Sequence, residues 1–217
     1  MFRTLLFILT ATTACNHDNK PKKINPASVS YIETKKENKQ PYKTILITAR
    51  EFKQQHIASD SLELLYSRFI VDSIIPNWYG TKWNFYGTTE VPQKGSIACG
   101  YFVTTVLRDA GLHINRIKLA QAASEEMMKI VCHKKSIKRF RHTPMQDFVN
   151  DLHQLENGLY IIGLDFHTGF IYHENEELLF IHASYQTPQM VIQQNVHESG
   201  ILAASKYKVV GKVNLSQ

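Results

Sequence analysis

The segment of residues 158–184 constrains the fold of this chain more than any other part of its sequence. Two runs rich in β-branched and aromatic residues flank the polar turn Glu174-Asn175-Glu176, a pattern typical of a β-hairpin. The rest of the C-terminal part also predicts strands. We expect the strands near residues 159–165, 168–173, 178–184, 189–194 and 207–213.

The part of the chain before this segment predicts helices. Apolar residues recur at helical spacing over residues 51–75, where Pro76 ends the pattern, and again over residues 120–131. A shorter helix is expected over residues 144–155, with Thr143 as its cap. Helices followed by consecutive strands indicate an α+β fold, in which an antiparallel sheet packs against helices on one side.

Residues 95–111 place one cysteine at a turn that opens an amphipathic helix. Gly111 follows as a stop signal, and apolar side chains recur at three- and four-residue spacing at Phe102, Val103, Val106, Leu107 and Ala110. The N-terminus of a helix carries partial positive charge, which favours the thiolate of Cys99, and the thiolate is the form of cysteine that attacks. Cys99 is therefore the candidate nucleophile. The alternative is an ordinary core cysteine.

Two histidines of the hairpin supply the base that such a nucleophile needs. If the turn centres on Asn175, paired residue numbers sum to about 350, so His167 faces Ala183 and His182 faces Thr168. Opposed side chains of an antiparallel pair lie about 5 Å apart, so one imidazole can orient the other. We expect His167 to be the base and His182 to orient it. Competitors for the orienting role are Asp165, Ser184 and Tyr185.

These residues also resemble a known family. The runs that carry the resemblance are His167-Thr-Gly-Phe-Ile-Tyr172, Phe180-Ile-His182-Ala-Ser184 and Trp83-Asn-Phe-Tyr-Gly-Thr88. Together with a cysteine at a helix start, they resemble the NlpC family of papain-like cell-wall peptidases over residues 75–185. The resemblance implies a papain-like, NlpC-type fold and a cysteine peptidase or amidase, with Cys99, His167 and His182 as its catalytic residues.

The sequence around the cysteine departs from that family. Members that cleave the stem peptides of peptidoglycan commonly carry Asp-Cys-Ser-Gly there, and the Asp and Ser help to hold the free amine of the substrate. This chain has Ala98-Cys99-Gly100-Tyr101 instead. The catalytic residues therefore carry over better than the preference for a stem peptide with a free N-terminal L-Ala.

Four residues that precede Cys99 in the sequence are candidates for binding substrate. Trp83, Asn84 and Tyr86 are expected to line the cleft. Gln93 lies six residues before the cysteine, a spacing also seen for the oxyanion-hole glutamine of papain-like proteases, so its amide is a candidate to stabilise an oxyanion. The alternative is that all four are ordinary loop residues whose rings simply pack.

The N-terminus predicts export. Residues 1–14 carry one basic residue and an apolar core too short to span a bilayer, as in a signal peptide. Their small-residue end before Cys15 resembles a bacterial lipobox, which implies cleavage before Cys15 and a lipid on its thiol. Residues 15–43 predict a disordered polar tether, and residues 44–217 one hydrolase domain. An ordinary secretory signal or a buried N-terminal helix is the alternative.

Charge and cysteine content exclude several other classes. The formal net charge is +6, and the one dense basic run, residues 133–142, predicts a solvated loop, with a site for an anionic substrate as the alternative. Export argues against a nucleic-acid partner. Cys132 is expected to be a buried free thiol, with a Cys99–Cys132 disulfide as the alternative in an oxidising compartment. No cysteine or histidine spacing is typical of zinc, so we expect no metal and no cofactor.

Together these features predict an exported, lipid-anchored, monomeric cysteine hydrolase of the bacterial cell envelope. Its expected substrate is a peptide or amide bond in a peptidoglycan fragment, and its lipid anchor holds it to a membrane. One alternative is an acyltransferase or amidase acting on a lipid or other non-wall substrate, although the order of cysteine before histidine counts against it. The other is a non-catalytic envelope binding protein on a hydrolase scaffold.

Overall fold

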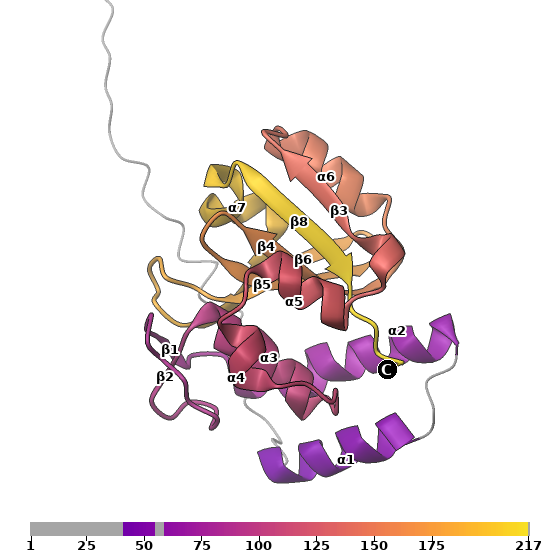
Figure 1. Ribbon diagram of the computed structural model, residues 1–217, viewed down its shortest axis with the longest axis vertical. Helices are drawn as coiled ribbons and strands as arrows, with labels where there is room; N and C mark the ends of the chain where they lie inside the picture. The colour runs from indigo at the N-terminus through magenta and orange to yellow at the C-terminus, as the bar shows by residue number, and fades with distance from the viewer. Residues whose placement is uncertain (1–40, 55–58, 217) are drawn as a thin grey trace, which may run out of the picture. The chain divides into compact units, whose positions relative to one another are not determined.

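Six strands form one antiparallel sheet in the order β3-β8-β4-β5-β6-β7 (Figure 1). The central strands β4, β5 and β6 are almost wholly buried, whereas the edge strands β3 and β7 are partly exposed. The bounds are β3 (Lys138–Arg141), β4 (Gly158–Leu164), β5 (Thr168–Glu174), β6 (Glu177–Ala183), β7 (Val191–Asn195) and β8 (Tyr207–Lys212). The expected α+β class with an antiparallel sheet is confirmed.

This computed structural model describes residues 41–54 and 59–216. The expected signal peptide, the lipidation site Cys15 and nearly all of the expected tether lie outside the described residues. The first described helix begins at Tyr42, two residues ahead of the start expected for the domain.

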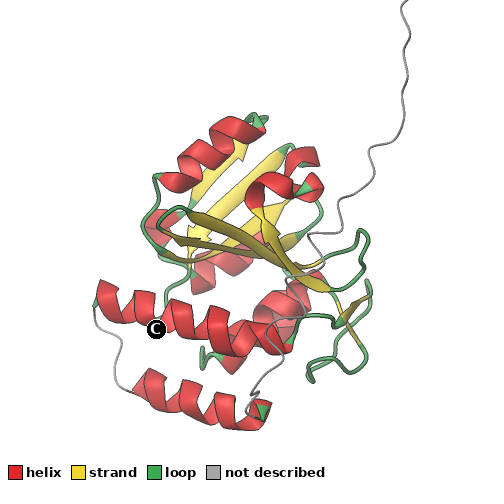
Figure 2. Cartoon of the chain, turned by 180° about the vertical axis from the view of Figure 1, so that it is seen from behind, coloured by secondary structure: helices red, strands yellow, loops and turns green. Residues whose placement is uncertain are grey.

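Helices cover both faces of the sheet (Figures 1 and 2). Their bounds are α1 (Tyr42–Gln54), α2 (Asp60–Phe69), α3 (Cys99–Asp109), α4 (Arg116–Ala120), α5 (Ser124–Val131), α6 (Met145–His153) and α7 (Gly200–Ala204). On one face α3 packs Phe102 against Phe170 and Ile181. On the other face α6 and α7 bury Phe148 and Leu202 against the sheet.

The expectation of helices on one side is therefore wrong. The physical reason is the composition of the central strands, since nearly every residue of β4, β5 and β6 is buried. A strand that is apolar on both faces has to be covered on both faces. The short helices α6 and α7, with a 3₁₀ turn at Val196–Glu198, provide the second cover.

Two of the expected helices have different bounds in the structure. The helix expected over residues 51–75 is α1 and α2, followed by a π-helical turn (Ile70–Ile74) and a 3₁₀ turn (Ile75–Asn77). Ser59 starts α2, because its hydroxyl accepts the Leu62 N–H at 3.3 Å. The helix expected over residues 120–131 is α5, which starts later, at Ser124, while the preceding α4 was not expected and is capped by Asn115, which accepts the Lys118 N–H at 3.0 Å.

Two smaller expectations also differ from the structure. Pro144 rather than Thr143 precedes the first turn of α6, without a side-chain cap. Part of the basic run expected to be a loop is the edge strand β3, which pairs with β8. Its Phe140 points inward, with its ring centroid 5.0 Å from that of Phe148, while the basic neighbours stay exposed.

The β5–β6 hairpin has a different register from the one expected. Glu174 pairs with Glu177, which leaves a two-residue turn with Asn175 at φ 55°, a left-handed conformation that Asn adopts readily. Continued along the strands, this register places His182 opposite Gly169 instead of Thr168. Because side chains alternate between faces, the observed register puts His167 and His182 on the same face, and the expected one would have separated them.

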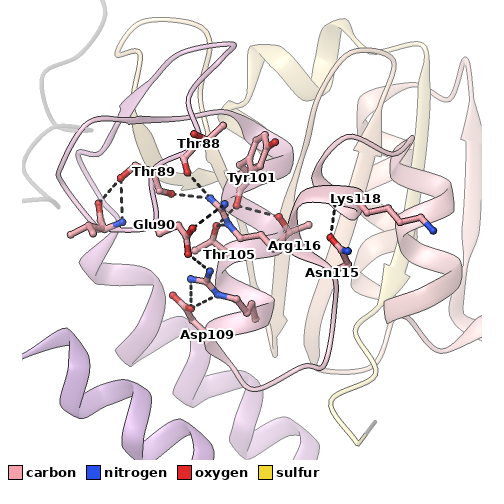
Figure 3. A network of polar contacts seen from close by, with 12 residues as sticks. Thr88, Thr89, Glu90, Tyr101, Thr105, Asp109, Asn115, Arg116 and Lys118 are labelled. Atoms are coloured by element: carbon pink, nitrogen blue, oxygen red, sulfur yellow. Dashed lines mark hydrogen bonds and ion pairs between the residues drawn. The ribbon is translucent and has the colours of Figure 1, made fainter.

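Arg116 fastens the loop that precedes α3 (Figure 3). The guanidinium is buried, and it donates to the Thr105 hydroxyl at 2.7 Å and to the carbonyls of Thr88 and Thr89 at 2.9 and 3.0 Å. It also lies 4.8 Å from the centroid of the Tyr101 ring. One side chain of α4 therefore links α3 to the loop that precedes Cys99.

Replacing Arg116 with Met leaves two backbone carbonyls and one hydroxyl without their donor. We expect Arg116→Met to lower the free energy of unfolding by about 2 kcal/mol or more in urea denaturation, since a hydrogen bond to a charged group is worth ~1.5–3 kcal/mol. Lys118→Met is the matched control, because Lys118 is exposed on the same helix, and we expect it to change stability by less than about 0.5 kcal/mol. Equal unfolding midpoints for the two variants would show that the hydrogen bonds of Arg116 do not stabilise the fold.

Candidate active site

A short parallel pair of strands carries the chain to Cys99. β1 (Lys82–Trp83) pairs with β2 (Ser96–Ile97), and the Ala98 N–H then donates to the carbonyl of Gly87 at 2.8 Å. A Cβ added at Gly87 would lie 2.5 Å from the backbone nitrogen of Ile97, so only glycine permits this approach of two backbone segments. The residue before the candidate nucleophile is thereby fixed in place.

Cys99 is the first residue of α3 and is half-buried. The backbone N–H groups of Thr168, Gly100 and Cys99 itself approach the sulfur and favour the thiolate. Burial nevertheless outweighs them and raises the pKa of the thiol above its ordinary value. The N–H groups at the start of the helix therefore favour the thiolate, but the desolvation cost of the charge is larger, so Cys99 rests as a thiol.

The structure brings the two histidines together. Nε2 of His167 lies 2.9 Å from Nδ1 of His182, and the rings are nearly perpendicular, at 85°, with centroids 5.0 Å apart. Both side chains are buried. We call these two residues the histidine pair. Since Nε2 of His167 is engaged by its partner, Nδ1 is the nitrogen left to exchange a proton with another group.

A glycine and an aromatic ring seat His182 beside its partner. A Cβ added at Gly169 would lie 2.8 Å from the Cβ of His182, so the glycine of the His-x-Gly run is needed for the strands to close. The Phe180 ring stacks on His182 with a centroid distance of 4.0 Å and an interplanar angle of 10°. These contacts bury both imidazoles among apolar groups.

Burial keeps the histidine pair uncharged. It lowers the pKa of His167 to about 4, and it lowers the pKa of His182 well below the ordinary histidine value, an effect that charge on His167 reinforces. Among the described residues, no carboxylate bonds to either ring. Both imidazoles are therefore neutral at pH 7.

The hydrogen bonds continue past the pair to two residues that the sequence analysis missed. The amide Nε2 of Gln194, on β7, lies 3.1 Å from Nε2 of His182 and donates to the Ser199 hydroxyl at 2.9 Å. His182 is paired with Ile192 across β6 and β7, so alternation puts Gln194 on the face of His182. The sequence signal that could have found Gln194 was a polar side chain at a strand position on the same face as His182.

The competitors for the orienting role are engaged elsewhere. Asp165 accepts the backbone N–H groups of Lys206 and Tyr207 at 2.7 and 3.2 Å. The Ser184 hydroxyl donates to the carbonyl of Gln186 at 2.9 Å. Tyr185 lies beside the pair, with its ring centroid 5.2 Å from that of His167, but it orients neither nitrogen by a hydrogen bond.

Cys99 and His167 line one cavity, although α3 and the histidine pair lie on opposite faces of the sheet. The helix α3 packs on the face that carries Phe170, whereas His182 and Phe180 belong to the opposite face. His167 directly precedes β5 and Cys99 is the first residue of α3, and both line one cavity. In the described part of the chain no hydrogen bond joins the Cys99 sulfur to either histidine.

The cavity beside these residues has a volume of about 570 Å³. Its walls come from the connection between α4 and α5 and from the turn between β4 and β5, and they include small residues such as Ala122 and Gly163. Glu125 and Asp165 are its charged lining residues, and Phe166 is 95% exposed beside it. The sequence analysis assigned none of the alanine and glycine residues of this wall to a cavity.

None of the four residues predicted to bind substrate lines this cavity. Tyr86 is 84% exposed and its backbone N–H donates to the side chain of Asn84 at 2.9 Å, which makes a local turn. The amide of Gln93 donates to the carbonyl of Asn77 at 3.2 Å, so it is engaged in the loop and not at the sulfur. The expected oxyanion role of Gln93 is not supported.

Trp83 lies closer to the site than the other three. Its ring centroid is 6.2 Å from that of Tyr185, which in turn packs on His167. Its indole N–H is buried and has no hydrogen-bond partner among the described residues. Trp83 therefore supports the aromatic cover of the histidine pair and does not contact the cavity.

The remaining cysteine and metal findings concern the described residues. Cys99 and Cys132 are both free thiols, and Cys132 is buried, as expected. Residues 41–54 and 59–216 contain no group of three or more histidine, cysteine, aspartate or glutamate side chains that could hold a metal ion. No helix within these ranges is both long enough and apolar enough to cross a bilayer.

Comparisons with known proteins give no relative for this chain. No protein-family model matches it, and no curated protein or solved structure matches it either.

Proposed function

We propose that this protein is a cysteine hydrolase that cleaves an amide or peptide bond, with Cys99 as its nucleophile. The observation that carries the proposal is the 2.9 Å hydrogen bond between His167 and His182, because His167 lines one cavity together with a cysteine at a helix start. A nucleophile, a base and a group that orients the base are the parts that such catalysis needs. Residues far apart in the sequence supply all three.

Each residue has a separate role in the proposed reaction. The Cys99 sulfur attacks the carbonyl carbon while Nδ1 of His167 takes the thiol proton, and that proton then goes to the leaving amine. Water hydrolyses the thioester and restores the thiol. His182 holds the imidazole of His167 in one tautomer. We assign stabilisation of the developing oxyanion to the backbone N–H groups at the start of α3.

The resemblance to the NlpC family supports a substrate in peptidoglycan and a papain-like arrangement of the site. The small residues of the cavity wall fit a short peptide with small side chains. The chain has no polar side chain at positions 98 and 100, where it carries Ala98 and Gly100 and where that family holds a free amine. We therefore propose a wall peptide or amide bond as substrate, without the family's preference for a free N-terminal L-Ala.

The Cys99→Ala variant tests the nucleophile. We expect it to lose at least about 10⁴-fold in the rate at which wall fragments are released from purified peptidoglycan, read by mass spectrometry, because no other group takes over the attack. Cys132→Ser is the control, since Cys132 lies outside the cavity wall facing Cys99, and it should keep its activity. Release by Cys99→Ala at the rate of the wild type would refute the assignment.

The pH profile tests the base. His167 must be neutral to accept a proton, and burial lowers its pKa from 6.5 to about 4, so it stays neutral down to about pH 4. We expect kcat/KM to hold between pH 7 and pH 5 and to fall as the pH drops through about 4. An acid limb centred near pH 6.5, the value of an unburied histidine, would show that His167 is not this base.

We also propose that the protein is exported and anchored to a bacterial membrane through a lipid on Cys15, a residue outside the described part of the chain. Cys15→Ser should move the protein from the membrane fraction to the soluble fraction and abolish labelling with a fatty-acid probe. A membrane-bound Cys15→Ser protein, or a wild-type N-terminal peptide without lipid in mass spectrometry, would contradict the anchor.

A further inference from the structure

A side-chain amide hydrogen-bonds to one end of the histidine pair. This amide determines which ring nitrogens donate and which accept in the hydrogen bonds of the site. A neutral imidazole carries one N–H and one lone pair, so each ring of the pair donates through one nitrogen and accepts through the other. Because His167 and His182 share a 2.9 Å hydrogen bond, the tautomer of one ring determines the tautomer of the other. The group at the far end of the pair therefore selects between two states of both rings.

Gln194 is the group at that end. One end of its amide lies 3.1 Å from Nε2 of His182 and 2.9 Å from the Ser199 hydroxyl. The two ends of a carboxamide have nearly the same shape, so a half-turn about the last side-chain bond exchanges nitrogen for oxygen at one position. The two orientations have opposite effects on His167.

With the amide nitrogen facing His182, as the structure has it, Nε2 of His182 accepts. Nδ1 of His182 then carries the proton and donates to Nε2 of His167, so Nδ1 of His167 also carries a proton. In this state His167 presents an N–H group to the cavity. It cannot take a proton from the Cys99 thiol.

With the amide oxygen facing His182, donor and acceptor exchange roles in each hydrogen bond between Gln194, His182 and His167. Nε2–H of His182 donates to the oxygen, Nε2–H of His167 donates to Nδ1 of His182, and Nδ1 of His167 is a free lone pair. The Ser199 hydroxyl fits this state too, because its oxygen already accepts the Leu202 N–H at 3.3 Å and its proton is available for the amide oxygen. Ser199 and His182 are both buried, so water does not compete for these sites.

We propose that Gln194 is the positioning residue of this site, and that in the active form its amide oxygen accepts from Nε2–H of His182 and so holds Nδ1 of His167 free to act as the base. This inference rests on the proposed function for its catalytic consequence. Gln194 does not line the cavity, so it acts through the histidine pair alone. No charged group takes its place, since neither ring bonds to a carboxylate among the described residues.

The tautomers are measured directly by ¹⁵N NMR of histidine-labelled full-length protein at pH 7. We expect the wild type to show protonated Nε2 and unprotonated Nδ1 at both His167 and His182, assigned through His167→Asn and His182→Asn. Protonated Nδ1 on both rings would overturn the proposal, and this measurement needs no variant of Gln194.

Substitutions at Gln194 test the cause. Gln194→Met keeps the length of the side chain and removes the acceptor, so we expect mixed tautomers and a loss of about 10- to 100-fold in kcat at unchanged KM. The rate at which iodoacetamide alkylates Cys99 should fall as well. Gln194→Glu restores the acceptor, so it should restore the wild-type tautomers. Iodoacetamide should also alkylate Cys99 faster in this variant than in Gln194→Met.

Gln193→Met is the matched control. Gln193 is the same residue type on the same strand, but its side chain points to the other face, where it accepts the Tyr79 hydroxyl at 2.5 Å. We expect wild-type tautomers, alkylation and kcat from this variant. If Gln194→Met, folded by circular dichroism, also matches the wild type in tautomers and alkylation, the proposal is wrong.

These readouts separate the inference from the proposed function. Wild-type tautomers that depend on Gln194, together with no cleavage of wall fragments, would support the positioning role and refute the substrate assignment. Cleavage by a protein with protonated Nδ1 on both rings would support the hydrolase and refute the role of Gln194.

Discussion

The register of the β5–β6 hairpin is the constraint on which the candidate site depends. A slip of one residue would carry His182 to the other face of the sheet and break its bonds to His167 and Gln194 together. Two local features select the observed register. Asn175 adopts the left-handed conformation that a two-residue turn requires, and Gly169 lets the strands close where any Cβ would meet His182 at 2.8 Å. A turn seven residues away from the site thus sets its chemistry.

Burial then determines the charge state of the site. The same desolvation that raises the pKa of Cys99 lowers the pKa of His167, so a thiol faces a neutral imidazole at rest. Charge would develop only as the proton moves, in a place where backbone N–H groups already approach the sulfur. Preorganised dipoles of this kind act without reorganisation at the moment of reaction. A site with so few charges depends on the direction of its hydrogen bonds, and for this reason a neutral amide at Gln194 can have a large effect.

The sequence alone predicted the elements of the site better than its surroundings. Helical periodicity located the start of α3 at Cys99, and the β-rich runs located both histidines, because these signals are local. The strand faces could not be settled from the same runs, since a two-residue turn and a three-residue turn differ by one position in register. The prediction for Trp83, Asn84, Tyr86 and Gln93 rested on a resemblance to segments that precede the nucleophile in papain-like enzymes. The cavity wall instead comes from α4, α5 and the β4–β5 turn, which tertiary packing alone brings to the cysteine.

Nucleophile and base are held by two separate parts of the fold. Cys99 is positioned by the backbone bond of Ala98 to Gly87 and by Arg116, whereas His167 is positioned by the sheet. The two parts meet in an apolar contact between α3 and the sheet, where Phe102 and Phe170 lie edge to face at 5.9 Å, and at the Thr168 N–H, which approaches the Cys99 sulfur. The separation between the sulfur and the imidazole is therefore set by core packing and not by a bond between them. Since packed cores resist small changes of volume, this arrangement fixes the distance while it leaves the proton free to move.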